Sequence, residues 1–157
     1  IADREKATAS VAAISLTAMV AGEIVGRLAS SRLALRFTEP VIIAGGVVVC
    51  TAGWALLWVA SSSGVAVAGL VVVGVGLGPF YPFGVALALA HSPLAPDRAQ
   101  GVVQLTNGLF SAPAPFLLGW MGDAWGIHQA FLAIPVVLVV VLVADWAAAR
   151  ASRPRPA

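Results

Sequence analysis

Long apolar stretches separated by short polar segments dominate this chain. No Asp, Glu, Lys or Arg occurs at residues 40–96, 99–122 or 124–144. Because a bilayer core about 30 Å thick needs about 20 apolar residues per helix, such stretches are typical of membrane spans. We therefore expect an all-α, polytopic transmembrane helical bundle. Its five predicted spans cover residues 7–28, 41–60, 64–90, 99–121 and about 129–149.

Composition agrees with this interpretation. Of the 157 residues, 60% are hydrophobic and 10% are charged, whereas soluble domains usually have about 45 to 50% apolar and about 25% charged residues. No segment is left over for a soluble domain, so we expect residues 1–157 to form one transmembrane domain. The chain begins at Ile1, without an initiator Met or a signal peptide, and we expect it to be a piece of a longer protein.

The basic residues predict how the helices are oriented. With five spans, one side of the membrane collects Arg27, Arg32, Arg36, Arg98, Arg150, Arg153 and Arg155, and the other collects only Arg4 and Lys6. The positive-inside rule then places the C-terminus, with a tail over residues 150–157, in the cytoplasm. This bias accounts for the net charge of +2, so we expect a lipid bilayer as the surroundings and no nucleic acid as a partner. We expect a multi-pass protein of the cytoplasmic membrane.

The fourth predicted span has a polar side. Gln100, Gln104, Asn107 and Ser111 follow a helical spacing and fall within an arc of about 60°. Amides that face hydrocarbon lack partners, so this arc should face the bundle interior or a wet cavity. Two interpretations stay open, because the arc suits both hydrogen bonds between helices and the lining of a solute pathway.

Prolines and glycines interrupt the third and fourth spans. The expected helix breaks are Pro79, Pro82, Pro113 and Pro115, and Gly74, Gly76 and Gly78 precede the first of them. Discontinuous helices commonly form transporter sites near the membrane midplane. At about 1.5 Å per residue, Tyr81 and Asn107 lie at similar depths, about 6 and 4.5 Å from the span centres, which allows them to share one site. The alternative is that these residues only shape helix packing.

The first predicted span carries one carboxylate, Glu23. Arg27 follows at i+4, so a local ion pair is one interpretation, and a proton-titrating role is the other. Gly22 and Gly26 have the spacing that lets another helix approach closely.

Motifs for enzyme chemistry are missing. His91 and His128 fall near opposite membrane faces and Cys50 is the single cysteine, so we expect no metal site. The sequence has no nucleophile elbow and no P-loop. We expect no cofactor and no enzymatic activity.

The order of features resembles the C-terminal half of a major facilitator superfamily transporter. Residues 26–36 resemble the second copy of that family's cytoplasmic loop motif, with Gly26, Arg27, Arg32 and Arg36 at its positions and Ser30 in place of its Asp. Residues 74–84 resemble its Gly/Pro-rich tenth helix, and residues 97–126 its eleventh helix and the following turn. The resemblance covers essentially the whole chain and implies helices eight to twelve. The missing N-terminal helices of the same protein would then be its partners.

This resemblance implies a secondary active transporter, a permease or an exporter, that moves a small solute by rocking two helical bundles. From their polarity and depth, we expect Asn107, Gln104 and Tyr81 to bind the solute, with Phe80 as an apolar wall and Glu23 as a more distant candidate for proton coupling. The alternative function is a non-transporting membrane anchor or assembly module, in which the polar arc only joins helices.

Overall fold

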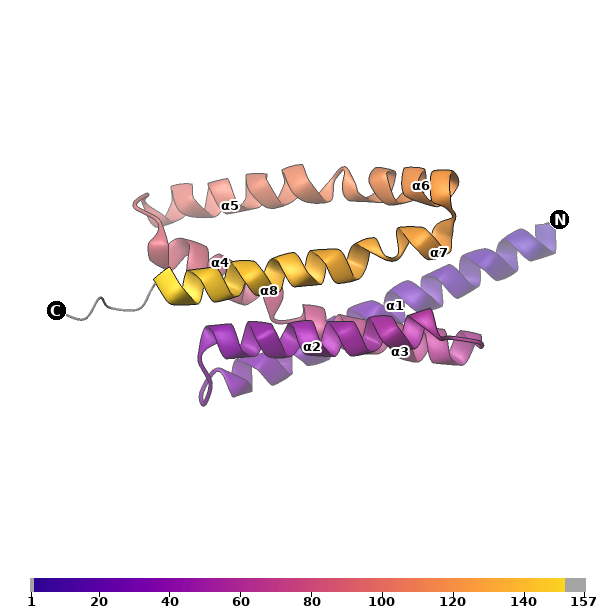
Figure 1. Ribbon diagram of the computed structural model, residues 1–157, viewed down its shortest axis with the longest axis horizontal. Helices are drawn as coiled ribbons and strands as arrows, with labels where there is room; N and C mark the ends of the chain where they lie inside the picture. Colours follow the sequence, from indigo (N-terminus) through magenta and orange to yellow (C-terminus); the bar gives the residue numbers. More distant parts are fainter. Residues whose placement is uncertain (1, 152–157) are drawn as a thin grey trace. The chain divides into compact units, whose positions relative to one another are not determined.

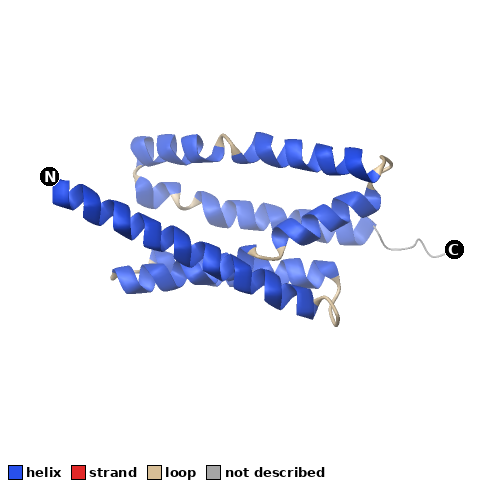
Figure 2. Ribbon diagram, turned by 180° about the vertical axis from the view of Figure 1, so that it is seen from behind, coloured by secondary structure: helices blue, strands red, loops and turns tan. Residues whose placement is uncertain are grey.

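The structure, a computed structural model, describes residues 2–151, and Figure 2 shows helices joined by loops in this part of the chain, without a strand. The helices are α1 (Ala2–Leu33), α2 (Glu39–Trp58), α3 (Ser63–Leu77), α4 (Phe80–His91), α5 (Pro96–Ser111), α6 (Ala114–Trp125), α7 (Ile127–Ala130) and α8 (Ala133–Ala151). The expected all-α class is therefore confirmed. Most of the expected tail, with Arg153 and Arg155, lies outside the described residues.

Three stretches of the described residues are long and apolar enough to cross a membrane, and Ala133–Ala147 is a shorter apolar helix. The three are Ala13–Leu33, Glu39–Trp58 and Ser63–Ala90. The helices differ from the five expected spans at three places. The third span contains both α3 and α4, and the fourth contains α5 and the first part of α6. The fifth span begins within α7 and continues in α8 after residues 131–132.

The divisions within the third and fourth spans each fall at a proline. Helix α3 ends at Leu77, before Gly78 and Pro79, and α5 ends at Ser111, before Ala112 and Pro113. Proline lacks a backbone N–H and its ring clashes with the preceding turn, which stops a helix. Pro82 and Pro115 instead lie in the first turns of α4 and α6. The first N–H groups of a helix have no partner within it, so proline costs no hydrogen bond there.

Local residue types explain the other helix ends. Pro40 lies in the first turn of α2, which follows an extended Thr38. The Ser62 side chain accepts a hydrogen bond from the Val65 N–H at the start of α3. Gly126 ends α6 with a φ of 88°, a left-handed conformation that glycine adopts without steric cost.

The chain divides into two compact units. The first takes in the described residues up to Phe80 and from Val137 onward, and the second is Tyr81–Val136. In the first unit α3 packs against both α1 and α2, as Figure 1 shows. In the second unit α6 follows α5 after the break, and α7 turns back against α6.

Glycines bring the backbones of α1 and α3 into direct contact. A methyl group added at Gly22 or Gly26 would overlap the carbonyl oxygen of Val71 or Val75 on α3. From the other side, a methyl group at Gly78 would lie 2.6 Å from the Arg27 backbone nitrogen. The expected close approach at Gly22 and Gly26 is thus confirmed, and α3 is the helix that approaches.

A second set of glycines joins α3 to α2. An added methyl carbon would lie 2.7 Å from the Gly76 oxygen if placed at Gly46, and 2.6 Å from the Val73 nitrogen if placed at Gly53. Cys50, only 2% exposed, lies between them and directs its thiol at the Val73 carbonyl, 3.5 Å away. Helix α3 is therefore in backbone contact with a neighbour on two of its faces.

Two adjacent glycines on α2 test this packing. Gly46 faces α3, whereas a methyl group at Gly45 meets nothing within 4 Å. Gly46→Ala should therefore lower the free energy of unfolding by about 1–3 kcal/mol, the usual cost of overpacking, and Gly45→Ala should leave it unchanged. Reaction of the buried Cys50 with a thiol-reactive dye during heating in detergent measures the difference. Equal midpoints for the two variants would contradict the contact.

Candidate functional site

Tyr81 and Gln104, two of the residues expected to bind solute, form a polar contact with each other. The Gln104 side-chain amide donates a hydrogen bond to the Tyr81 hydroxyl at 2.7 Å. Tyr81 begins the second unit near the start of α4, and Gln104 lies midway along α5. Both side chains are exposed at the surface of this unit, Tyr81 by 41%. The pair thus joins the two helices without being buried between them.

The hydrogen bond leaves two donors and an acceptor unused. Tyr81 still has its O–H proton, and Gln104 still has its second amide N–H and its amide oxygen. If the amide were turned over, Tyr81 would donate to the oxygen, and both amide N–H donors and a phenol acceptor would remain. In both cases the pair presents neighbouring hydrogen-bonding groups of opposite kind.

The other predicted solute-facing residues are placed differently. Asn107 lies one turn beyond Gln104 on the same side of α5, and its side chain is exposed. Phe80 belongs to the first unit, where its ring lies against Gly46 of α2. The structure therefore brings Tyr81 and Gln104 together, with Asn107 beside them along the helix, and gives Phe80 a packing contact of its own.

Glu23 and Arg27 form an ion pair within α1. The Arg27 guanidinium donates to the Glu23 carboxylate, and the two side chains are 50% and 29% exposed, in the order Arg27 and Glu23. The local pairing expected from the i, i+4 spacing is confirmed. Because the backbone of Glu23 also borders Gly74 and Gly78, this charge pair lies at the contact between α1 and α3.

The residues of the loop motif lie along the last turns of α1 and in the turn that follows it. Gly26 packs on Val75, and Arg27 pairs with Glu23, whereas no ion pair joins Arg32 or Arg36 to another described residue. Ser30, which stands where the loop pattern has Asp, is 4% exposed, and its hydroxyl donates to the Arg27 carbonyl at 3.0 Å. Ser30 thus forms a local hydrogen bond, whereas an Asp at this position would add a negative charge.

Two features were not singled out by the sequence analysis. The Arg150 guanidinium stacks 3.6 Å from the centre of the Trp146 ring. The i, i+4 spacing of this arginine and tryptophan could have predicted the cation–π contact. The burial of Ser30 depends on packing between helices, which no local pattern reveals. Among the described residues, no group of three or more His, Cys, Asp and Glu side chains forms a metal site.

Comparison with known proteins identifies the family. The family model of the Major Facilitator Superfamily matches residues 4–157. The chain belongs to this superfamily. Searches of curated proteins and of solved structures found no match for this chain.

Members of the major facilitator superfamily are membrane-embedded transporters of small solutes, so this chain is a transporter of the major facilitator type. In such a chain a lone carboxylate within a span carries a large desolvation cost. The Glu23–Arg27 pair lowers that cost for α1. A role of Glu23 in proton coupling stays a prediction.

The ion pair can be tested by removing one or both partners. Arg27→Gln leaves the Glu23 carboxylate without its partner and should lower the free energy of unfolding by about 1–3 kcal/mol. The double variant Glu23→Gln/Arg27→Gln should recover most of that loss, because neither charge remains. Thermal unfolding in detergent measures both, with Arg32→Gln as the control. A double variant less stable than Arg27→Gln would show that the pair does not act as a unit.

Proposed function

We propose that this major facilitator protein is a secondary active transporter, and that Tyr81, Gln104 and Asn107 face the path of a small, neutral, polar or amphipathic solute. The hydrogen bond between Tyr81 and Gln104 is the observation that carries this proposal. It joins α4, which is otherwise apolar, to the polar arc of α5 by groups that retain hydrogen-bonding capacity.

The chemistry of these groups favours a neutral solute. A phenol and two amides bind hydroxyl, amide or carbonyl groups and offer no opposite charge to an ionic solute. The charge nearest to Gln104 along α5 is Arg98, almost two turns away. A solute with one donor and one acceptor side by side would fit the free groups of Tyr81 and Gln104.

Alternating access supplies the mechanism that we propose. In this mechanism two helical bundles rock around a central site, and the second wall comes from the N-terminal helices that the family resemblance implies. The interruptions at Pro79 and Pro113 support it, because broken helices provide places where a bundle can bend. Phe80 is proposed as an apolar wall and Glu23 as a secondary candidate for coupling to protons.

The arginine distribution supports the orientation that we propose. Arg32, Arg36 and Arg98 fall on the side that the positive-inside rule assigns to the cytoplasm. The C-terminus would then also be cytoplasmic, in a protein of the cell membrane. Both import by a permease and export by an efflux carrier fit this arrangement.

Cysteine labelling tests whether α5 lines a wet path. In a Cys50→Ala background, Gln104→Cys and Asn107→Cys should react with a membrane-impermeant maleimide, because water reaches their side of the helix. Leu109→Cys is the control, since Leu109 is 69% exposed on the side of α5 roughly opposite Asn107. If positions 104 and 107 react no faster than position 109, the polar arc only joins helices.

A transport assay tests the roles of the individual groups. The full-length gene product in vesicles is offered polyols, neutral amides and amino acids, with and without a pH gradient. For a transported solute, Tyr81→Phe, Gln104→Ala and Asn107→Ala should each lower the rate by about 2- to 10-fold, the usual value of one hydrogen bond. Membrane abundance should not change.

Thr106→Val is the matched polar control, because Thr106 lies on α5 outside the polar arc. Equal losses of rate and abundance in the three variants would assign them a structural role. No transport of any probe, together with unreactive cysteines, would favour the membrane anchor.

A further inference from the structure

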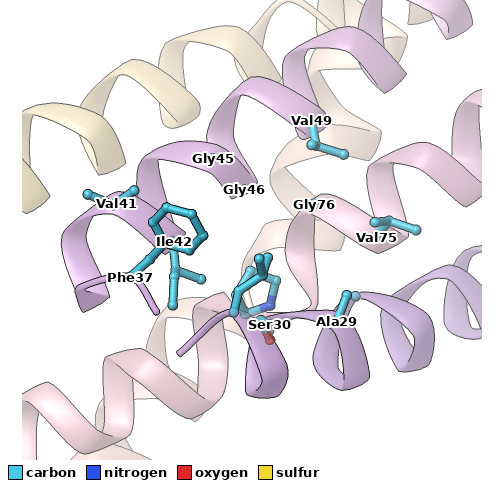
Figure 3. A pocket seen from close by; sticks show the side chains of 13 residues that line it. Ala29, Ser30, Phe37, Val41, Ile42, Gly45, Gly46, Val49, Val75 and Gly76 are labelled. Carbon is cyan, nitrogen blue, oxygen red and sulfur yellow. The ribbon is translucent and has the colours of Figure 1, made fainter. Parts of the chain in front are cut away.

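A cavity of about 270 Å³ lies in the first unit, at the end of α1 where the polypeptide turns toward α2. Figure 3 shows its wall, which comes from the last turns of α1, the first half of α2 and the last turn of α3. Gly45 leaves space open, because a side chain there would meet nothing within 4 Å, whereas Gly46 and Gly76 line the cavity where α2 and α3 are in backbone contact. The glycine contacts that join α2 to α3 therefore also shape this cavity.

The wall of the cavity is apolar. Its apolar lining residues include Leu33, Phe37, Ile42, Val49 and Val75. Ser30 is the one lining residue with a polar side chain, and its hydroxyl already donates to the Arg27 carbonyl at 3.0 Å. Apolar cavities hold water poorly and accept hydrocarbon well. The interior therefore suits a hydrocarbon chain and offers no partner to a polar solute.

Two arginines, Arg32 and Arg36, are adjacent in sequence to residues of this apolar wall. Arg32 precedes the lining residue Leu33, and Arg36 precedes the lining residue Phe37. The backbone N–H groups of Arg36 and Phe37 both donate to the Leu33 carbonyl at 2.9 Å, which holds the two arginines on one tight turn. Both are exposed.

Acidic groups offset this charge only in part. Glu23 is already paired with Arg27 within α1. Glu39, in the first turn of α2, is the one other acid in residues 24–96. The turn between α1 and α2 therefore keeps an excess of positive charge next to residues that line an apolar cavity.

We propose that this cavity binds an anionic phospholipid, with part of one acyl chain among α1, α2 and α3 and the phosphate group at Arg32 and Arg36. The bilayer around the chain supplies such a lipid at high local concentration. Guanidinium groups bind phosphate strongly and with two parallel hydrogen bonds, and juxtamembrane basic residues attract anionic lipids. The bound chain fills the open space at Gly45, next to the contact of Gly46 with Gly76, so it stabilises the packing of α2 on α3.

The acyl-chain part is tested by filling the cavity. Gly45 lines the cavity, and a side chain there meets nothing within 4 Å, so Gly45→Leu occupies the space without pushing α2 away from α3. The control is Gly64→Leu, because Gly64 is equally unobstructed and lies outside the cavity. The full chain is purified, exposed to mixed micelles of phosphatidylglycerol and phosphatidylcholine, and examined by native mass spectrometry.

The unchanged chain and Gly64→Leu should retain phosphatidylglycerol, and Gly45→Leu should lose it. Protection of Cys50 from a thiol reagent checks that each variant is folded, and Ala29→Phe fills the same cavity if Gly45→Leu does not fold. Retention by both filled variants would overturn the proposal. So would retention of phosphatidylcholine in equal amount by the unchanged chain.

The headgroup part is tested with the arginines. Arg32→Gln/Arg36→Gln should lower the preference for phosphatidylglycerol over phosphatidylcholine by about 25-fold at low salt, since each basic residue near the membrane surface contributes about fivefold. Arg98→Gln is the control, because Arg98 is exposed on α5 and lies outside the cavity. An unchanged preference in the double variant, or an equal loss with Arg98→Gln, would show that these arginines do not select the lipid.

Discussion

Backbone contact on two faces of α3 is the constraint on which the first unit depends. Helices in a membrane gain no hydrophobic free energy from meeting each other, because the lipid tails are as apolar as the side chains. Their association relies instead on close packing. Here that packing needs glycine at Gly22 and Gly26 of α1 and at Gly46 and Gly53 of α2, since a methyl group at any of them would overlap the α3 backbone or approach it within 3 Å.

The packing of α3 also sets the position of the Tyr81–Gln104 hydrogen bond along the chain. Gly78 makes the last close contact with α1, and Pro79 prevents α3 from continuing. Phe80 still lies against Gly46, whereas Tyr81, the next residue, bonds to Gln104. Of these two neighbouring residues, Phe80 thus packs against another helix and Tyr81 forms a hydrogen bond. A break in the helix allows this change, because side chains on either side of it no longer follow one periodic surface.

Much of this could be predicted from residue types alone. The absence of charge over long stretches predicts the helical membrane fold, the prolines predict where helices stop, and the spacing of Glu23 and Arg27 predicts their ion pair. The partner of Gly22 and Gly26 could not be predicted, because a small-residue spacing shows that a helix approaches but not which one. The burial of Ser30 and the hydrogen bond from Gln104 to Tyr81 could not be predicted either, since both depend on contacts between segments distant in sequence.

Weak, neutral hydrogen bonds suit the proposed role better than charges would. A transporter has to release its solute as readily as it binds it, and each neutral hydrogen bond contributes only about 0.5–1.5 kcal/mol net. Because Tyr81 and Gln104 already bond to each other, neither pays the full cost of an unsatisfied polar group when the solute leaves. The one acid within α1 is likewise paired with Arg27. Tyr81, Gln104 and Glu23 thus each keep a partner without solute, which makes an empty state energetically accessible.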